Sequence, residues 1–308
     1  MPERLPRALI ACLLLSALAA GVARAAVDAA SERAEVARWR AERLRALTGD
    51  DGWLTLAGLL WLSEGSNSFG RSSGNALVLD HAALPERAGT FEVTGTRVRF
   101  LSAPGAHVTH AGQAVHELEL TSDAHGEPTE LASGPLRFFV IERGGRLAVR
   151  VRDLDNPHRS NFRGLDYFPV DPGWALEARF EPYEPARHLT IINVLGMEVQ
   201  LVSPGAVVFE KDGRQWRLDT VLEDPGAREL FIMFADETSG KETYGGGRFL
   251  YIPLPVGSRA QLDFNKSENP PCALNDFATC PLPPAQNRIG LRINAGEEQY
   301  RGNPGHTP

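Results

Sequence analysis

Polar side chains that could do chemistry gather in one stretch of the sequence, between Phe231 and Arg288. Two apolar strands are expected there, and the turns that follow them carry carboxylate, phenol, guanidinium and amide groups: Asp236, Tyr244, Arg248, Asp263, Asn265 and Asn269. Carboxylates act as general bases, and arginine or amide groups stabilise negative charge or hold an anion. The stretch therefore predicts a site for a small polar or anionic ligand, and we assign no metal and no cofactor to it.

Three interpretations of these residues stay open. In the first, they line the pocket of a binding module, in which an arginine between carboxylates keeps the pocket rigid. In the second, the protein is a hydrolase with Asp236 or Asp263 as general base, and Arg248 or Asn265 stabilises developing negative charge. In the third, the same residues form an internal ion network of a structural protein. The binding module is favoured because no nucleophile, histidine base or metal cluster is visible.

The first 25 residues have the features of a secretory signal peptide. Arg4 and Arg7 form a basic start, residues 8–20 are apolar, and residues 23–25 form a small-x-small cleavage site. We expect cleavage near Ala25 and a periplasmic or secreted protein. No later stretch is long and apolar enough to predict a transmembrane segment.

Two cysteines remain after this cleavage, Cys272 and Cys280, because Cys12 lies in the signal peptide. An even pair in an oxidising compartment is typical of a disulfide, so we expect these two residues to be bonded. A metal site lacks further ligands in this stretch, and a nucleophilic Cys272 lacks a nearby histidine.

Composition and charge exclude some classes of partner. The chain has 308 residues, of which 43% are hydrophobic and 23% charged, as is typical of one or two globular domains. Its formal charge is −7 at pH 7, and loss of the arginine-containing signal peptide makes it more negative. An acidic chain is unsuited to nucleic acid or an anionic membrane, so we expect neither as a partner. The sequence leaves the oligomeric state open.

The elements that must position the site are mainly β. Residues 26–50 predict an amphipathic helix, because Val36, Trp39, Leu44 and Leu47 recur at helical spacing. Short strands separated by glycine, asparagine and proline clusters follow without another helical pattern. We expect a β-sandwich over residues 51–130 and a second antiparallel barrel or sandwich over residues 131–308, which includes the proline-rich loop.

A polar loop over residues 156–166 carries Arg159, Asn161 and Arg163. It follows the strand patterns of residues 136–155 and precedes the other strands of the second β unit. Two interpretations stay open: the loop presents cations to an anionic ligand, or it is solvated and holds only local salt bridges.

The first β unit resembles a forkhead-associated domain. The resemblance rests on short motifs between Gly65 and Thr121, among them Arg71 and the Gly105-Ala106-His107-Val108 turn. It implies a sandwich whose loops hold phosphothreonine, with Arg71 as the first phosphate-binding residue. Residues 85–89 replace the serine-arginine-x-histidine run of that family, so we expect the scaffold without the phosphopeptide site.

Most of the chain also resembles the uncharacterised prokaryotic family known as domain of unknown function 1684. The motifs that carry the resemblance are Gly52-Trp53-Leu54, Asp236-Glu237-Thr238-Ser239-Gly240, Arg248-Phe249-Leu250, Asn269-Pro270-Pro271-Cys272-Ala273 and Ala278-Thr279-Cys280-Pro281. The resemblance extends over nearly all of the chain after residue 25. It implies no biochemical role, and Lys266-Ser267-Glu268 departs from the family's sequence.

Overall fold

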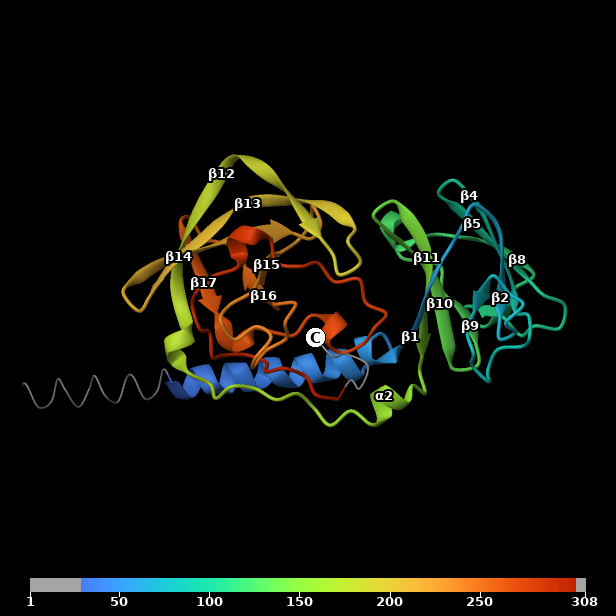
Figure 1. The fold of residues 1–308 in the computed structure, drawn as a ribbon, viewed down its shortest axis with the longest axis horizontal. Coiled ribbons are helices and arrows are strands. Elements are labelled where there is room, and N and C mark those ends of the chain that lie inside the picture. The colour runs from blue at the N-terminus through green and yellow to red at the C-terminus, as the bar shows by residue number, and fades with distance from the viewer. Residues whose placement is uncertain (1–28, 303–308) are drawn as a thin grey trace, which may run out of the picture.

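The structure, a computed structural model, describes residues 29–302. A long helix of residues 29–48 runs beneath one β domain, and a second β lobe lies beyond the end of the helix (Figure 1). The predicted class, mainly β with one N-terminal helix, is confirmed. The predicted signal peptide, residues 1–25, lies outside the described residues. Within residues 29–302, no helix has the length and apolar character needed to cross a membrane.

Two sheets form the first β domain. One has the strand order β3-β2-β4-β5-β8 and the other the order β1-β11-β10-β9-β6-β7. All pairs are antiparallel except β2 with β3. The strands are β1 Leu56–Trp61, β2 Gly65–Gly70, β3 Leu77–Val78, β4 Gly89–Thr94, β5 Arg97–Ser102, β6 Thr109–His110, β7 Gln113–Ala114, β8 Glu117–Leu120, β9 Leu131–Ser133, β10 Leu136–Arg143 and β11 Arg146–Asp153.

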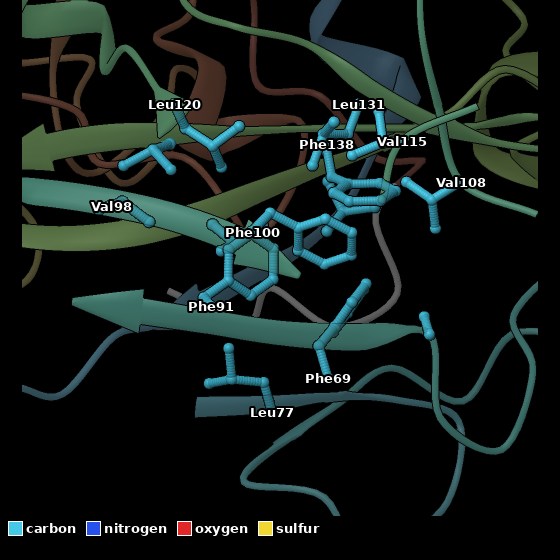
Figure 2. Close-up of a cluster of buried hydrophobic side chains, with 14 of the residues drawn as sticks. Phe69, Leu77, Phe91, Val98, Phe100, Val108, Val115, Leu120, Leu131 and Phe138 are labelled. Carbon is cyan, nitrogen blue, oxygen red and sulfur yellow. The ribbon is translucent and has the colours of Figure 1, made fainter. Parts of the chain in front are cut away.

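Phenylalanine side chains fill the space between these two sheets (Figure 2). Alternation along β4 and β5 turns Phe91 and Phe100 inward, and Phe138 of β10 faces them from the other sheet. The rings of Phe91 and Phe100 lie 4.9 Å apart, and those of Phe69 and Phe138 lie 5.4 Å apart. These tilted contacts are the geometry that aromatic pairs prefer. The first β domain is therefore a sandwich with one continuous core.

The boundary between the β domains differs from the predicted one. The sequence pattern places the second domain from residue 131, but β9, β10 and β11 belong to the sheet of β1. β1 and β11 pair from Leu56↔Arg152 to Trp61↔Ala148. Local patterns do not identify this pairing, because tertiary packing decides which strands meet. The resemblance to a forkhead-associated domain is not confirmed.

The second β domain is built on one six-stranded sheet in the order β16-β15-β14-β13-β12-β17. The sheet curls so that β16 approaches β17, which makes it nearly a closed barrel. Its core includes Trp174, Phe209, Phe234 and Phe264. The strands are β12 Ala175–Ile192, β13 Glu198–Lys211, β14 Arg214–Leu222, β15 Glu229–Phe234, β16 Arg248–Pro253 and β17 Arg259–Asp263.

Short helices mark the connections and the C-terminal segment. The only α-helix among them in the described residues is α2, Pro157–Ser160, in the segment that joins the two β domains. The 3-10 turns are η1 Trp53–Thr55, η2 Asp123–His125, η3 Pro172–Trp174, η4 Phe264–Lys266, η5 Pro271–Ala273 and η6 Ala285–Asn287. After β17, the described chain runs over the second domain without a further strand.

The helix of residues 29–48 packs on the second domain with a face that differs from the predicted stripe. Val36 and Leu47 are buried, whereas Leu44 is 43% exposed. Arg43 lies in the interface instead, where Nη2 donates to the carbonyl of Asn269 at 2.8 Å and Nε lies 3.1 Å from Glu297 Oε1. Ion pairs therefore help to hold the helix, and a search for apolar spacing does not detect them.

Candidate functional site

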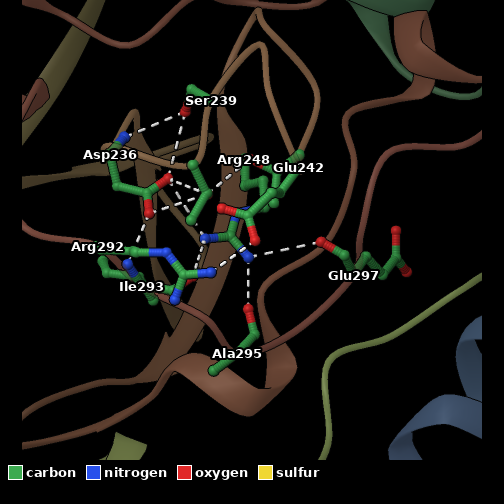
Figure 3. A network of polar contacts seen from close by, with 10 residues as sticks. Asp236, Ser239, Glu242, Arg248, Arg292, Ile293, Ala295 and Glu297 are labelled. Atoms are coloured by element: carbon green, nitrogen blue, oxygen red, sulfur yellow. Dashed lines mark hydrogen bonds and ion pairs between the residues drawn. The ribbon is translucent and has the colours of Figure 1, made fainter.

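Asp236 and Arg248 meet at the end of the neighbouring strands β15 and β16 (Figure 3). Arg248 pairs with Phe234 across the sheet, and Asp236 follows Phe234 by two residues. Arg248 Nη2 lies 3.4 Å from Asp236 Oδ1, and both side chains are fully buried. The two strands thus bring the charged groups together inside the domain.

The oxygen atoms of the Asp236 carboxylate accept hydrogen bonds from groups of the chain itself. It accepts hydrogen bonds from Thr238 Oγ1 at 2.8 Å, from Ser239 Oγ at 3.2 Å and from the Ile293 N–H at 2.7 Å. The Asp-Glu-Thr-Ser-Gly motif therefore forms a tight turn around its own first carboxylate. A general base needs access to a ligand's proton, and this carboxylate faces only the protein.

The Arg248 guanidinium is held in a similar way. It donates to the carbonyl oxygens of Ile293 at 2.9 Å, of Ala295, and of Glu297 at 3.5 Å, and its Nε has no partner. Burial lowers the pKa of Arg248, and the nearby Asp236 carboxylate opposes that change. These contacts clamp residues 291–297 onto the end of the sheet. The geometry supports the third interpretation, an internal ion network, for Asp236 and Arg248.

Asn265 and Asn269 satisfy backbone groups. The Asn265 side chain exchanges two hydrogen bonds with the backbone of Asp171, at 3.1 and 2.9 Å. Asn269 Nδ2 donates to the carbonyl of Glu298 at 2.8 Å, and its N–H donates to Glu297 Oε2 at 2.7 Å. Both amides thereby fix irregular segments where no strand partner is present.

Asp263 lies apart from the Asp236–Arg248 pair, in a surface cleft of about 300 Å³ between β17 and the N-terminal helix. Lys266 Nζ is 3.2 Å from its carboxylate and 2.6 Å from Glu35. Burial and the negative charge of Asp263 raise the pKa of Glu32 to about 7. No group of three or more His, Cys, Asp and Glu side chains in residues 29–302 is arranged to hold a metal ion.

Cys272 and Cys280 are free, buried thiols, so the predicted disulfide is not formed in this structure. The Cys272 N–H donates to Cys280 Sγ at 3.1 Å. Hydrogen bonds with the Cys280 thiol and the Tyr244 hydroxyl lower the pKa of Cys272, whereas burial raises that of Cys280. Burial, with a contribution from Cys272, raises the pKa of Tyr244. The two sulfur atoms are therefore accommodated as hydrogen-bonded thiols in an apolar cluster.

A cleft of about 600 Å³ opens between α2 and the C-terminal segment, and we call it the α2 cleft. Such a volume is typical of sites for small molecules. Its lining includes His158, Asn161, Arg163, Leu165, Tyr300 and Arg301. None of the residues predicted from the strand ends lines it.

Local hydrogen bonds fix the walls of the α2 cleft. The Asn156 side chain caps α2 by accepting from the His158 N–H at 2.9 Å. His158 Nε2 lies 3.1 Å from the Tyr300 hydroxyl, so the loop and the C-terminal segment meet. Burial lowers the pKa of His158, which favours the neutral ring at pH 7.

The polar loop of residues 156–166 holds local ion pairs, and part of it also borders the α2 cleft. Arg159 is structural, since Nε donates to the carbonyl of Thr48 at 2.7 Å and Nη2 pairs with Asp50 at 2.8 Å at the end of the N-terminal helix. Asn161 and Arg163 instead line the α2 cleft. The sequence indicates this side of the cleft, but Tyr300 and Arg301 come from a distant segment with no recognisable motif.

The fold and the cleft define a two-domain, mainly β protein with a polar site beside the link between the domains. Residues 160–298 match the model of a family described as a protein of unknown function, DUF1684. The match covers the second β domain and most of the C-terminal segment, a narrower range than the sequence motifs indicate.

Comparison with other proteins adds no activity. None of the curated proteins matches the chain significantly. Among solved structures, an uncharacterized protein of Haloarcula marismortui, determined by NMR in solution, is 31% identical. The similarity covers 46% of this chain and 78% of that protein, with a TM-score of 0.39.

Proposed function

We propose that this protein binds a small anionic molecule in the α2 cleft. The observation that carries the proposal is the pair of arginines in the lining, Arg163 and Arg301. Across residues 29–302, neither arginine has a carboxylate partner or a hydrogen bond, although most other arginines of the second domain are paired. Guanidinium groups recognise carboxylates and phosphates through paired N–H donors.

The lining also holds one carboxylate, Asp166, which the two arginines outnumber, and the remaining groups suit a small polar ligand. His158 and Tyr300 contribute a ring nitrogen and a hydroxyl that already contact each other, and Asn161 adds an amide. Leu165 supplies an apolar wall. A few polar groups around a partly apolar cleft are the usual pattern of a small-molecule site, where they fix the orientation of the ligand. A carboxylate or phosphate ester of low molecular mass fits this set of groups.

The proposal is tested by thermal unfolding of the chain from Ala26 with a panel of small carboxylates and phosphates. A ligand is expected to raise the unfolding temperature of the wild type and to have no effect on the double variant Arg163→Gln/Arg301→Gln. The control is Arg97→Gln/Arg228→Gln, which removes the same charge from exposed positions elsewhere. Equal shifts in all three proteins, or none with any member of the panel at millimolar concentration, would contradict the α2 cleft as the site.

We also propose that the protein is exported and acts in the periplasm or outside the cell. The support is the basic, apolar and small-residue pattern of residues 1–25. A fusion of these residues to a reporter enzyme that is active only outside the cytoplasm is expected to be active. Loss of that activity on replacing the apolar run with polar residues would agree, and an inactive fusion would contradict the proposal.

A further inference from the structure

One face of the second sheet of the first domain carries five arginines on two neighbouring strands. They are Arg137 and Arg143 on β10 and Arg146, Arg150 and Arg152 on β11. The register pairs Arg137 with Arg152 and Arg143 with Arg146, so these side chains share a face. β11 lies on the side of its lobe nearest the other domain (Figure 1), and a Cβ atom at Gly144, in the turn beside it, would lie 3.2 Å from Met197 Cβ of that domain.

Four of these arginines have an evident partner or are hydrated. Three form ion pairs with carboxylates: Arg137 with Glu130 at 3.6 Å, Arg143 with Asp123 at 2.7 Å and Arg152 with Asp51 at 2.8 Å. Arg146 is exposed and stacks on the ring of Trp61 at 4.3 Å. Its charge is therefore in contact with water.

Arg150 has neither. Its side chain sits between Leu59 and Phe139 on the neighbouring strands, and the residue is 4% exposed. Its Nε and Nη2 are buried without a hydrogen-bond partner, and no carboxylate of residues 29–302 forms an ion pair with it, although Asp123 lies near enough to raise its pKa. The ring of Trp53 lies 5.5 Å from the guanidinium carbon. Burial and the like charge of Arg143 lower the pKa of Arg150 to about 10, so the group still carries its charge at neutral pH.

A buried, unpaired charge destabilises the folded state, and native proteins rarely keep one without a partner. The two unpartnered donors, Nε and Nη2, form the same side edge of the guanidinium plane. That edge is the one that a carboxylate or a tetrahedral oxyanion contacts with two oxygen atoms at once.

We propose that Arg150 anchors a site for a small oxyanion at the junction of the two β domains. Arg143 and Arg152 lie close enough to add positive potential, although each is itself paired. The apolar neighbours of Arg150 leave little polar surface for a larger ligand, so the anion is a simple carboxylate, sulfate or phosphate. The site uses no residue of the α2 cleft and is independent of the function proposed above.

The test measures thermal unfolding of four proteins: a parent with no change at residues 146 and 150, and its variants Arg150→Met, Arg150→Lys and the control Arg146→Met. All four carry Arg163→Gln/Arg301→Gln, so that anions in the α2 cleft do not contribute. Acetate, sulfate and phosphate are compared with chloride at equal ionic strength, which separates carboxylate from inorganic oxyanion as the ligand.

In chloride, Arg150→Met is expected to be at least as stable as the parent, because an uncompensated buried charge is removed. One of the oxyanions is expected to raise the unfolding temperature of the parent and of Arg146→Met by roughly 3 °C or more, once its concentration is ten times its Kd. Arg150→Met should lack this rise, and Arg150→Lys should lose most of it, because an ammonium group has no side edge.

Sulfate and phosphate also stabilise proteins generally, by exclusion from the surface. Equal rises of the unfolding temperature in all four proteins would show that the anions act only by exclusion from the surface, and would overturn the proposal. A large loss of stability of Arg150→Met in chloride, with the same anion shifts as the parent, would overturn it as well, since Arg150 would then be a structural residue only.

Discussion

Arg248 is fully buried, and its charge is balanced inside the protein by Asp236 and by the carbonyl oxygens of residues 293–297. A buried ion pair adds little net stability compared with a well-packed apolar pair. Removal of one partner is different, because it leaves the other charge stranded in the interior. At the scale of the residue, the network therefore holds the C-terminal segment against the sheet and has no reactive role.

Arg248→Ala is expected to lower the free energy of unfolding by about 3–5 kcal/mol, the range for one missing partner of a buried pair. The matched control is Arg292→Ala, which breaks the 2.6 Å contact with Glu242 at the surface of the same network (Figure 3). An exposed pair of this kind contributes less than about 1 kcal/mol. Urea unfolding measures both, and similar losses of unfolding free energy in the two variants would contradict the role of Arg248 in holding the C-terminal segment.

The sequence predicts part of this site and not the rest, for a physical reason. The apolar runs of β15 and β16 make it clear that Asp236 and Arg248 stand at strand ends. What fills the space around them is Ile293 to Glu297, which returns from far along the chain. The type and spacing of residues indicate which chemistry a side chain is capable of, whereas the groups that surround the side chain are known only from tertiary contacts.

At the scale of the element, the N-terminal helix joins parts that are far apart in sequence. Leu47 packs with Leu54 of η1 and Leu274 after η5, and Trp53, Phe162 and Tyr300 surround them. This small cluster connects the helix, the start of the first domain and the C-terminal segment. Helical spacing predicts the helix and the burial of Leu47, but it wrongly includes Leu44, because Arg43 takes that place in the interface.

Two leucines of this helix provide a matched test of the cluster. Leu47→Ala is expected to cost about 2–5 kcal/mol of unfolding free energy, since it removes a fully buried side chain from a small core. Leu44→Ala, three residues earlier and 43% exposed, is expected to change it by less than about 0.5 kcal/mol. Denaturant unfolding followed by tryptophan fluorescence measures both. If Leu44→Ala proved the more damaging, the helix would pack with the other face.

At the scale of the whole molecule, the helix and the C-terminal segment share one charged interface. Arg43 reaches Glu297 and Glu268 at 3.1 and 3.3 Å, and Glu35 reaches Lys266. Burial, together with the charge of Glu297, raises the pKa of Glu268 from 4.5 to about 7, although Arg43 opposes this. Protonation of one partly buried carboxyl group thus affects the attachment of the helix to the second domain.

A raised pKa means that the folded state binds the Glu268 proton more tightly than the unfolded state. The contribution of this group to stability is therefore complete below about pH 4.5 and is lost as pH rises towards 7. Relative to the wild type, Glu268→Gln is expected to gain stability over this range, by on the order of a few kcal/mol, and to stay level above it.

Urea unfolding of both proteins at a series of pH values measures this difference. The control is Glu86→Gln, an exposed carboxyl in an ion pair of the first domain. Parallel curves for Glu268→Gln and the wild type between pH 4.5 and 7 would show that Glu268 does not titrate differently in the folded protein.

The clamp on residues 291–297 also governs when the second domain can be completed during synthesis. A ribosome makes Asp236 and Arg248 well before Ile293, so the growing chain holds this charged pair without the amide and carbonyl groups that later surround it. Contacts of such long sequence separation form late and slow the overall rate of folding. Until those last residues emerge, Leu291, Ile293 and Ala295 are missing from the core of the second domain, and we expect the newly made protein to be more open to chaperones and proteases.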